Sequence, residues 1–243
     1  MDCCGFQLSI SSKMDYLVIN LSSLIIPLLF SFHPKLGFYK EWKYALPAIG
    51  ITLIPFVIWD IIFTYYEIWG FNENYLLGIY VFNLPIEELL FFVCIPYACL
   101  FTYHCFKVLK PEKNYDNWRK FGVFFLIVIC TVSILFFADK WYTFLTSILL
   151  LICIIVFNSN KPEWLGKFFS VYIIILIPFF IVNGLLTGTF YDLPIVWYDD
   201  LENTSFRLLT IPIEDVFYGL LLLLTNVFLY EKFKSKKNTR ISV

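Results

Sequence analysis

The sequence predicts an all-helical membrane protein whose seven spanning helices form two parallel three-helix repeats joined by a linker helix. Composition is the first reason, because 60% of the 243 residues are hydrophobic and only 15% are charged, as in chains with many membrane spans. The second is a series of apolar segments about as long as a bilayer is thick. The third is an acidic motif that occurs once in each half of the chain.

Seven apolar segments alternate with polar connectors, and each predicts one spanning helix. The expected spans are residues 16–32, 44–66, 75–106 or 84–106, 121–138, 141–157, 168–186 and 206–230. Residues 1–15 are polar, and no small-residue cleavage pattern follows the first apolar segment, so we expect this segment to remain as the first span. A basic tail follows the last span, from Lys232 onward.

The acidic motif reads Pro-Ile-Glu-Glu at residues 85–88 and Pro-Ile-Glu-Asp at residues 212–215. An Ile-Pro-Phe triplet also occurs twice, at residues 54–56 and 177–179. Similar offsets for two motifs indicate a duplicated three-span unit. The whole chain, 1–243, is expected to be one integral membrane domain. Its expected parts are a first repeat at 16–107, a connector and linker helix at 108–139, a second repeat at 140–231 and a tail at 232–243.

Lysine and arginine predict the orientation of the spans. With seven spans, fifteen of the eighteen Lys and Arg residues fall on one side of the membrane, and Lys13, Lys140 and Arg207 fall on the other. Cytoplasmic loops carry the excess of these residues, so the amino terminus is expected outside and the carboxyl terminus in the cytoplasm. The linker helix crosses the membrane once between the two three-span repeats, so both repeats begin on the same side and run parallel. Both acidic motifs are then expected at the same depth.

The acids of the motif are the candidate catalytic residues: Glu87, Glu88, Glu214 and Asp215. An acidic residue at the centre of a membrane helix costs roughly 2.5–3.5 kcal/mol, and less toward its end. A helix start offers a simpler explanation, because proline fits the first turn and carboxylates there face the positive end of the helix dipole. Nearly the same tetrapeptide in two helices favours a shared cavity between the halves, which all four acids line or abut.

Other polar and aromatic residues are expected to support this cavity. Asp60 and Asn183 occupy nearly matching places in the second and sixth spans. The expected aromatic residues are Trp59, Phe91, Phe92, Phe217 and Tyr218, and aromatic faces stabilise cations without offering a nucleophile. Adjacent helical residues point about 100° apart, so at most one acid of each pair faces the cavity directly.

Absent motifs narrow the possible chemistry. The chain has no G-x-G dinucleotide fingerprint and no P-loop, so we expect no cofactor. The two histidines, His33 and His104, lie near the cytoplasmic ends of their spans, so no metal site is expected either. A retinal-binding photoreceptor would need a buried lysine, and the seventh span has none before Lys232.

The paired Pro-Ile-Glu-Glu and Pro-Ile-Glu-Asp motifs, each opening a membrane helix, resemble those of the membrane lycopene cyclases of the heterodimeric and fused type. In that family a P-x-E-E-x-x-F/Y motif marks each of two related subunits or halves. The resemblance covers nearly the whole chain, including the stretch at residues 192–198 before the second motif. The second motif departs from the pattern in having Asp215 as its second acid.

The resemblance implies acid-catalysed, non-redox closure of ionone-type rings, as in a lycopene beta-cyclase, on a linear carotenoid within the bilayer. It also implies a lipophilic substrate, other carotenoid-pathway enzymes as partners, no nucleic acid, and the bacterial inner membrane as the location. Two alternatives remain open from the residues alone. One is an acid-catalysed cyclase of another isoprenoid, and the other is a proton-coupled transporter with parallel repeats.

Overall fold

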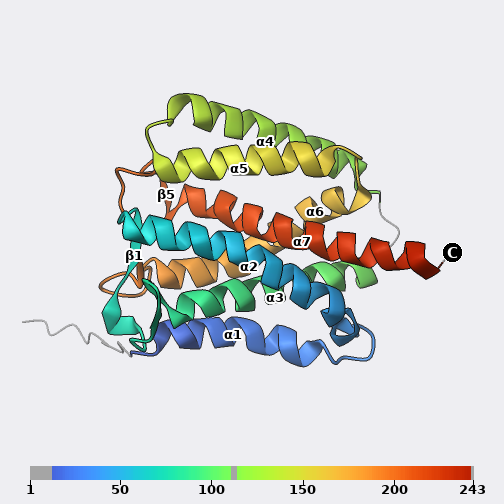
Figure 1. Ribbon diagram of the computed structural model, residues 1–243, viewed down its shortest axis with the longest axis horizontal. Coiled ribbons are helices and arrows are strands. Elements are labelled where there is room, and N and C mark those ends of the chain that lie inside the picture. The colour runs from blue at the N-terminus through green and yellow to red at the C-terminus, as the bar shows by residue number, and fades with distance from the viewer. Residues whose placement is uncertain (1–12, 111–113, 242–243) are drawn as a thin grey trace, which may run out of the picture.

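The computed structural model describes residues 13–110 and 114–241, in which the helices lie side by side along the long axis of the molecule (Figure 1). The helices are α1 (Asp15–Phe30), α2 (Trp42–Tyr65), α3 (Ile86–Leu109), α4 (Asp116–Phe136), α5 (Trp141–Asn158), α6 (Glu163–Leu186) and α7 (Ile213–Ile241), with short 3-10 turns η1 (Phe38–Glu41) and η2 (Glu73–Tyr75). In Figure 1, α4 and α1 form the two opposite edges of the bundle. The first twelve residues, expected outside the bilayer, and Lys113 lie outside the described residues.

Six of the seven expected spans are long and apolar enough to cross a membrane, counted over the described part of the chain: α2 to α7. The remaining helix, α1, is apolar but has 16 residues. At 1.5 Å per residue its length is about 24 Å, whereas a hydrocarbon core is about 30 Å thick. It nevertheless packs along α3 as part of the bundle.

Helix α3 begins two residues after the later of its two expected starts, and α7 begins seven residues after its expected start, because short hairpins precede both helices. Strand β2 (Tyr80–Val81) pairs with β3 (Leu84–Pro85), and β5 (Arg207–Leu208) pairs with β6 (Ile211–Pro212). A proline disfavours helical backbone in the residue before it, so each helix starts after its proline. Both acids of each pair then fall in the first helical turn.

Three other boundaries differ from the expected ones. Helix α4 begins at Asp116 and α6 at Glu163, each five residues before the apolar segment that predicted it. In α4 this polar first turn is stabilised by ion pairs of Asp116 with Arg119 and Lys120. Helix α7 continues to Ile241, so the expected tail that follows Tyr230 is helical from Lys232 to Ile241.

The repeat seen in the sequence is also a structural repeat. The backbone N–H of Ile86 donates to Ile79 O at 2.9 Å, and that of Ile213 donates to Phe206 O at 3.0 Å, so both hairpins close in the same way. The halves meet in a third ladder, in which β1 (Trp69–Phe71) pairs antiparallel with β4 (Val196–Tyr198). This ladder and the two hairpins lie at one end of the bundle, and the carboxyl terminus lies at the other (Figure 1).

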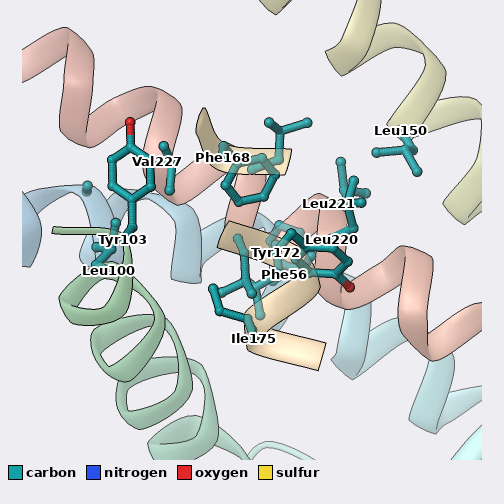
Figure 2. Packing of buried hydrophobic residues seen from close by; sticks show 14 of the residues in the cluster. Phe56, Leu100, Tyr103, Leu150, Phe168, Tyr172, Ile175, Leu220, Leu221 and Val227 are labelled. Carbon is teal, nitrogen blue, oxygen red and sulfur yellow. The ribbon is translucent and has the colours of Figure 1, made fainter. Parts of the chain in front are cut away.

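The two halves pack against each other unequally. Helix α2 packs closely along α7, whereas the corresponding pair, α6 and α3, shares much less contact. Figure 2 shows buried residues of this core, among them Phe56 of α2, Phe168 of α6 and Leu221 of α7. The looser packing around α6 leaves space between α6, α1, α3 and α7.

Candidate functional site

A cavity of about 660 Å³ fills the space between α1, α3, α6 and α7. Its lining on α1 extends from Asp15 to Pro27, and residues of β1 and β4 close the end near the hairpins. The walls are mainly aliphatic and aromatic. Among the lining residues, Val18, Ile26 and Ile181 are more than half exposed on the outside of the bundle, so the cavity reaches the surface between α1 and α6.

One acid of each motif lines this cavity, and it is the second one. Glu88 and Asp215 both contribute to the wall, whereas Glu87 and Glu214 do not. All four side chains are at most 7% exposed. Because successive residues in a helix point about 100° apart, the first turns of α3 and α7 aim one carboxyl group inward and the other toward the preceding loop.

Glu87 and Glu214 hold these loops. The backbone N–H of Leu77 donates to Glu87 Oε1 at 2.7 Å, and the backbone N–H of Thr204 donates to Glu214 Oε1 at 2.8 Å. Thr143 Oγ1 also donates to Glu214 Oε1, at 2.6 Å. The other oxygen of each carboxyl group, Oε2, is buried and has no hydrogen-bond partner among the described residues.

The second acids are held by tyrosines. Tyr16 donates a short hydrogen bond to Glu88 Oε2. Tyr142 donates to Asp215 Oδ1 at 2.6 Å, and Tyr198 donates to Asp215 Oδ2 at 2.9 Å. Burial and the neighbouring Asp215 carboxylate raise the pKa of Tyr198, which lies in β4, well above its ordinary value. This phenol therefore remains a neutral hydrogen-bond donor.

The two polar residues expected to support the acids also line the cavity. Asn183 Nδ2 donates a long hydrogen bond of 3.5 Å to Asp215 Oδ2. Asp60 Oδ1 accepts a hydrogen bond from Trp69 Nε1 at 2.5 Å. Its other oxygen, Oδ2, is buried without a partner among the described residues.

The aromatic residues divide into two groups. Phe91 and Tyr218, which occupy the same place in the two motifs, line the cavity. The other three residues expected to support the cavity, Trp59, Phe92 and Phe217, are not part of its wall. Trp59 packs edge-on behind Tyr218, with ring centroids 5.1 Å apart, and the other two sit beside lining residues and turn into the core.

Sequence reasoning missed Tyr16, Tyr142, Trp69 and Tyr198 as cavity residues. The repeat held a signal for the first two, because Tyr16 and Tyr142 stand near the start of the first helix of each half at nearly the offset of the acidic motifs. Trp69 and Tyr198 carry no such signal. They reach the acids through the β1–β4 ladder, which joins segments far apart in the chain.

The fold and this site define a class: membrane proteins in which buried acids face an apolar cavity between two repeated halves. Comparison with protein families then identifies the group, because the model of the family described as lycopene cyclase matches residues 13–106 and 139–233. The chain belongs to the lycopene cyclase family, whose two matched segments correspond to its two halves. Searches of curated proteins and of solved structures gave no significant match.

Membership of this family gives the chain a role in the cyclisation of carotenoids as an enzyme of the membrane. The internal duplication suggested by the repeated motifs is confirmed by the two matched segments. An apolar substrate of this kind fits a cavity whose walls are mostly aliphatic and aromatic.

Proposed function

We propose that this protein closes ionone-type rings of the beta type on a linear carotenoid by acid catalysis, with Glu88 and Asp215 as the catalytic acids. One observation carries the proposal: the second acid of each motif, and not the first, lines a single apolar cavity between the halves. General acid and base groups contribute about 10²–10⁴-fold to a rate when they are held in reach of the reacting atoms.

The reaction needs no oxidant or reductant. A proton added to the terminal double bond of the carotenoid gives a tertiary cation, and the electron pair of the next double bond attacks it to form the ring. Loss of a proton from the ring restores a neutral product. The aromatic faces of Phe91 and Tyr218, which line the cavity, support the cation during these steps.

The substrate enters from the bilayer between α1 and α6. Val18, Ile26 and Ile181 line the cavity and are 53%, 62% and 60% exposed, so this opening has an apolar rim. A long apolar polyene can therefore pass from the lipid into the cavity without crossing water.

In the membrane, we infer seven spans, with the amino terminus outside and the carboxyl terminus in the cytoplasm. The charge distribution of the sequence supports this orientation, and α1 spans by continuing through the turn that follows it. The hairpins and the acids then lie toward the outer side of the inner membrane of a bacterial cell.

Expression in a lycopene-producing host tests the proposal. Wild-type protein is expected to convert lycopene to cyclised pigment, whereas Glu88→Gln and Asp215→Asn are expected to lose normal ring formation. Glu87→Gln and Glu214→Gln are the matched controls, since they change the neighbouring acid in the same turn. If Glu88→Gln and Asp215→Asn both kept normal ring formation, these acids would be structural only.

A second measurement tests the absence of a redox step. Purified protein in lipid vesicles containing lycopene is expected to form rings at the same rate with and without reduced flavin. Ring formation only after addition of reduced flavin would contradict the proposed chemistry.

A further inference from the structure

Glu88 and Asp215 occupy the same place in the two halves, but the residues around them differ. This difference in surroundings indicates different roles for the two acids. Resting on the proposed function, we propose that Glu88, together with Asp60, delivers the proton that starts ring closure. Asp215 stays ionised, faces the cation and takes up the proton that leaves. The two acids of a duplicated motif thus act as acid and base.

Asp215 accepts hydrogen bonds from three donors. Tyr142 donates to Oδ1, and Tyr198 and Asn183 donate to Oδ2, at 2.6, 2.9 and 3.5 Å. An ionised carboxylate only accepts hydrogen bonds, so donors on both oxygens favour the charged form. A negative charge held in this way is placed to stabilise a carbocation and then to accept a proton.

Glu88 has a different environment. Tyr16 is its one hydrogen-bond donor among the described residues, and this bond is to Oε2. Asp60 lines the same cavity as Glu88, and Asp60 Oδ2 is buried without a partner among the described residues. Two carboxyl groups in one apolar cavity cannot both ionise at low cost. Asp60 has an oxygen without a partner in the described part of the chain, whereas both oxygens of Asp215 accept hydrogen bonds, so the shared proton is assigned to Glu88 and Asp60.

Two substitutions between the halves create this contrast. The β1–β4 ladder pairs Gly70 with Trp197 at its centre. These two residues are 127 positions apart in the chain, as the two acidic motifs are. The counterpart of Tyr198 is therefore Phe71, which lines the cavity but has no hydroxyl group to donate. The counterpart of Asn183 is Asp60, so an amide donor in one half is replaced by a second acid in the other.

The steps balance without another reactant. The proton of Glu88 adds to the terminal double bond, whose electron pair forms the new C–H bond and leaves a tertiary cation. The next double bond supplies the electrons of the new C–C bond. A ring carbon then loses its proton to Asp215, the electrons of that C–H bond form the ring double bond, and return of this proton to Glu88 resets the site with no net change in protons.

Product analysis of single variants in membranes distinguishes the two roles. Glu88→Gln is expected to yield linear carotenoid alone, because no cation forms. Asp215→Asn is expected to yield cyclised products in which the ring double bond has moved or water has been captured, because the cation forms but its base is missing. Folding of each variant is checked by gel filtration and thermal unfolding in detergent.

Asp60→Asn tests the shared proton. The asparagine side chain keeps an oxygen to accept the Trp69 hydrogen bond, so the fold is expected to persist. We expect kcat to fall about 10- to 100-fold with an unchanged KM and unchanged products, in line with the loss of part of a general-acid contribution. Asn183→Leu, the matched change in the other half, is expected to alter the ring products instead.

Three outcomes would overturn the assignment while wild-type protein still cyclises lycopene. In the first, folded Asp215→Asn yields linear carotenoid alone. In the second, Glu88→Gln yields altered rings. In the third, the kcat of Asp60→Asn stays within about twofold of wild type. If Asp215→Asn does not fold, Tyr198→Phe replaces it, and products identical to wild type would then count against the assignment. Wild-type protein that leaves lycopene linear would instead refute the proposed function itself.

Discussion

At the scale of single residues, adjacent acids in one helical turn have separate surroundings. Glu87 accepts a hydrogen bond from the backbone N–H of Leu77 and faces the loop. Glu88 accepts a hydrogen bond from the hydroxyl of Tyr16 and faces the cavity. The same division is found at Glu214 and Asp215. Holding the preceding loop and lining the cavity therefore belong to different residues of each motif.

Glu214 offers a test of the loop-holding role by stability. Its Oε1 accepts two hydrogen bonds and its Oε2 accepts none among the described residues. Glu214→Gln keeps the acceptor and is expected to change the free energy of unfolding by less than about 1 kcal/mol. Glu214→Ala leaves Thr143 Oγ1 and the Thr204 N–H unpaired, and is expected to cost about 1–3 kcal/mol.

Thermal or denaturant unfolding in detergent measures both values. Glu87→Ala is a useful comparison, because Glu87 accepts one such hydrogen bond and a smaller loss is expected. Equal stability of Glu214→Ala and wild type would show that this carboxyl group does not hold the loop.

At the scale of elements, the linker helix α4 is fixed by close approach of backbones. Gly166 in α6 lies against the start of α4, where an added Cβ would be 2.2 Å from Tyr115 O. A backbone carbonyl cannot move away as the end of a flexible side chain can. Small residues at such crossings let helices pack without intervening side chains, and this contact helps to place α4 beside the second half.

Gly166→Ala is expected to destabilise the protein by about 1–3 kcal/mol through overpacking. Gly50→Ala is the matched control, because Gly50 lies in α2 with nothing within 4 Å of an added Cβ, and alanine favours helix more than glycine does. Melting temperatures in detergent compare the two variants. A Gly166→Ala protein as stable as Gly50→Ala would contradict the close contact of α6 with α4.

At the scale of the whole molecule, the cavity depends on both halves. Its walls come from α1 and α3 of the first half and from α6 and α7 of the second. The β1–β4 ladder and the packing of α2 on α7 join the halves. Neither half alone encloses the acids, so the single site is a property of their association.

Separate expression of the halves tests this dependence. A chain ending at residue 110 and a chain starting at residue 114 are expected to form rings when co-expressed in a lycopene-producing host, and neither is expected to do so alone. The physical reason is that the interface between the halves is extensive and apolar, so the two halves associate by close helix packing. Full activity from either half by itself would refute the shared cavity.

The orientation is tested by reporters at the two ends of α7. At the carboxyl terminus, a reporter that works only in the cytoplasm is expected to be active, and one that works only outside is expected to be inactive. In the loop before β5, the opposite result is expected. The reason is the excess of Lys and Arg on the carboxyl-terminal side, which is typical of cytoplasmic loops. The opposite pattern would reverse the proposed topology.

The sequence by itself determined the class of the molecule, its repeat and most of its helices. Apolar segments long enough for a bilayer have few alternative structures, because every backbone polar group in lipid must be satisfied within the segment. The two prolines before the acids also determined where the acids enter their helices, although the hydrophobic pattern alone placed those helix starts too early.

The tertiary structure alone decided which residues face the cavity. Whether Glu87 or Glu88 points inward depends on the rotation of α3 about its axis, which is set by packing against α1 and α2 and not by local sequence. Trp69 and Tyr198 reach the acids through a ladder that joins segments more than a hundred residues apart. The looser packing of α6 than of α2, which leaves room for one cavity in an otherwise repeated molecule, arises from many small differences between side chains and has no signature in a single motif.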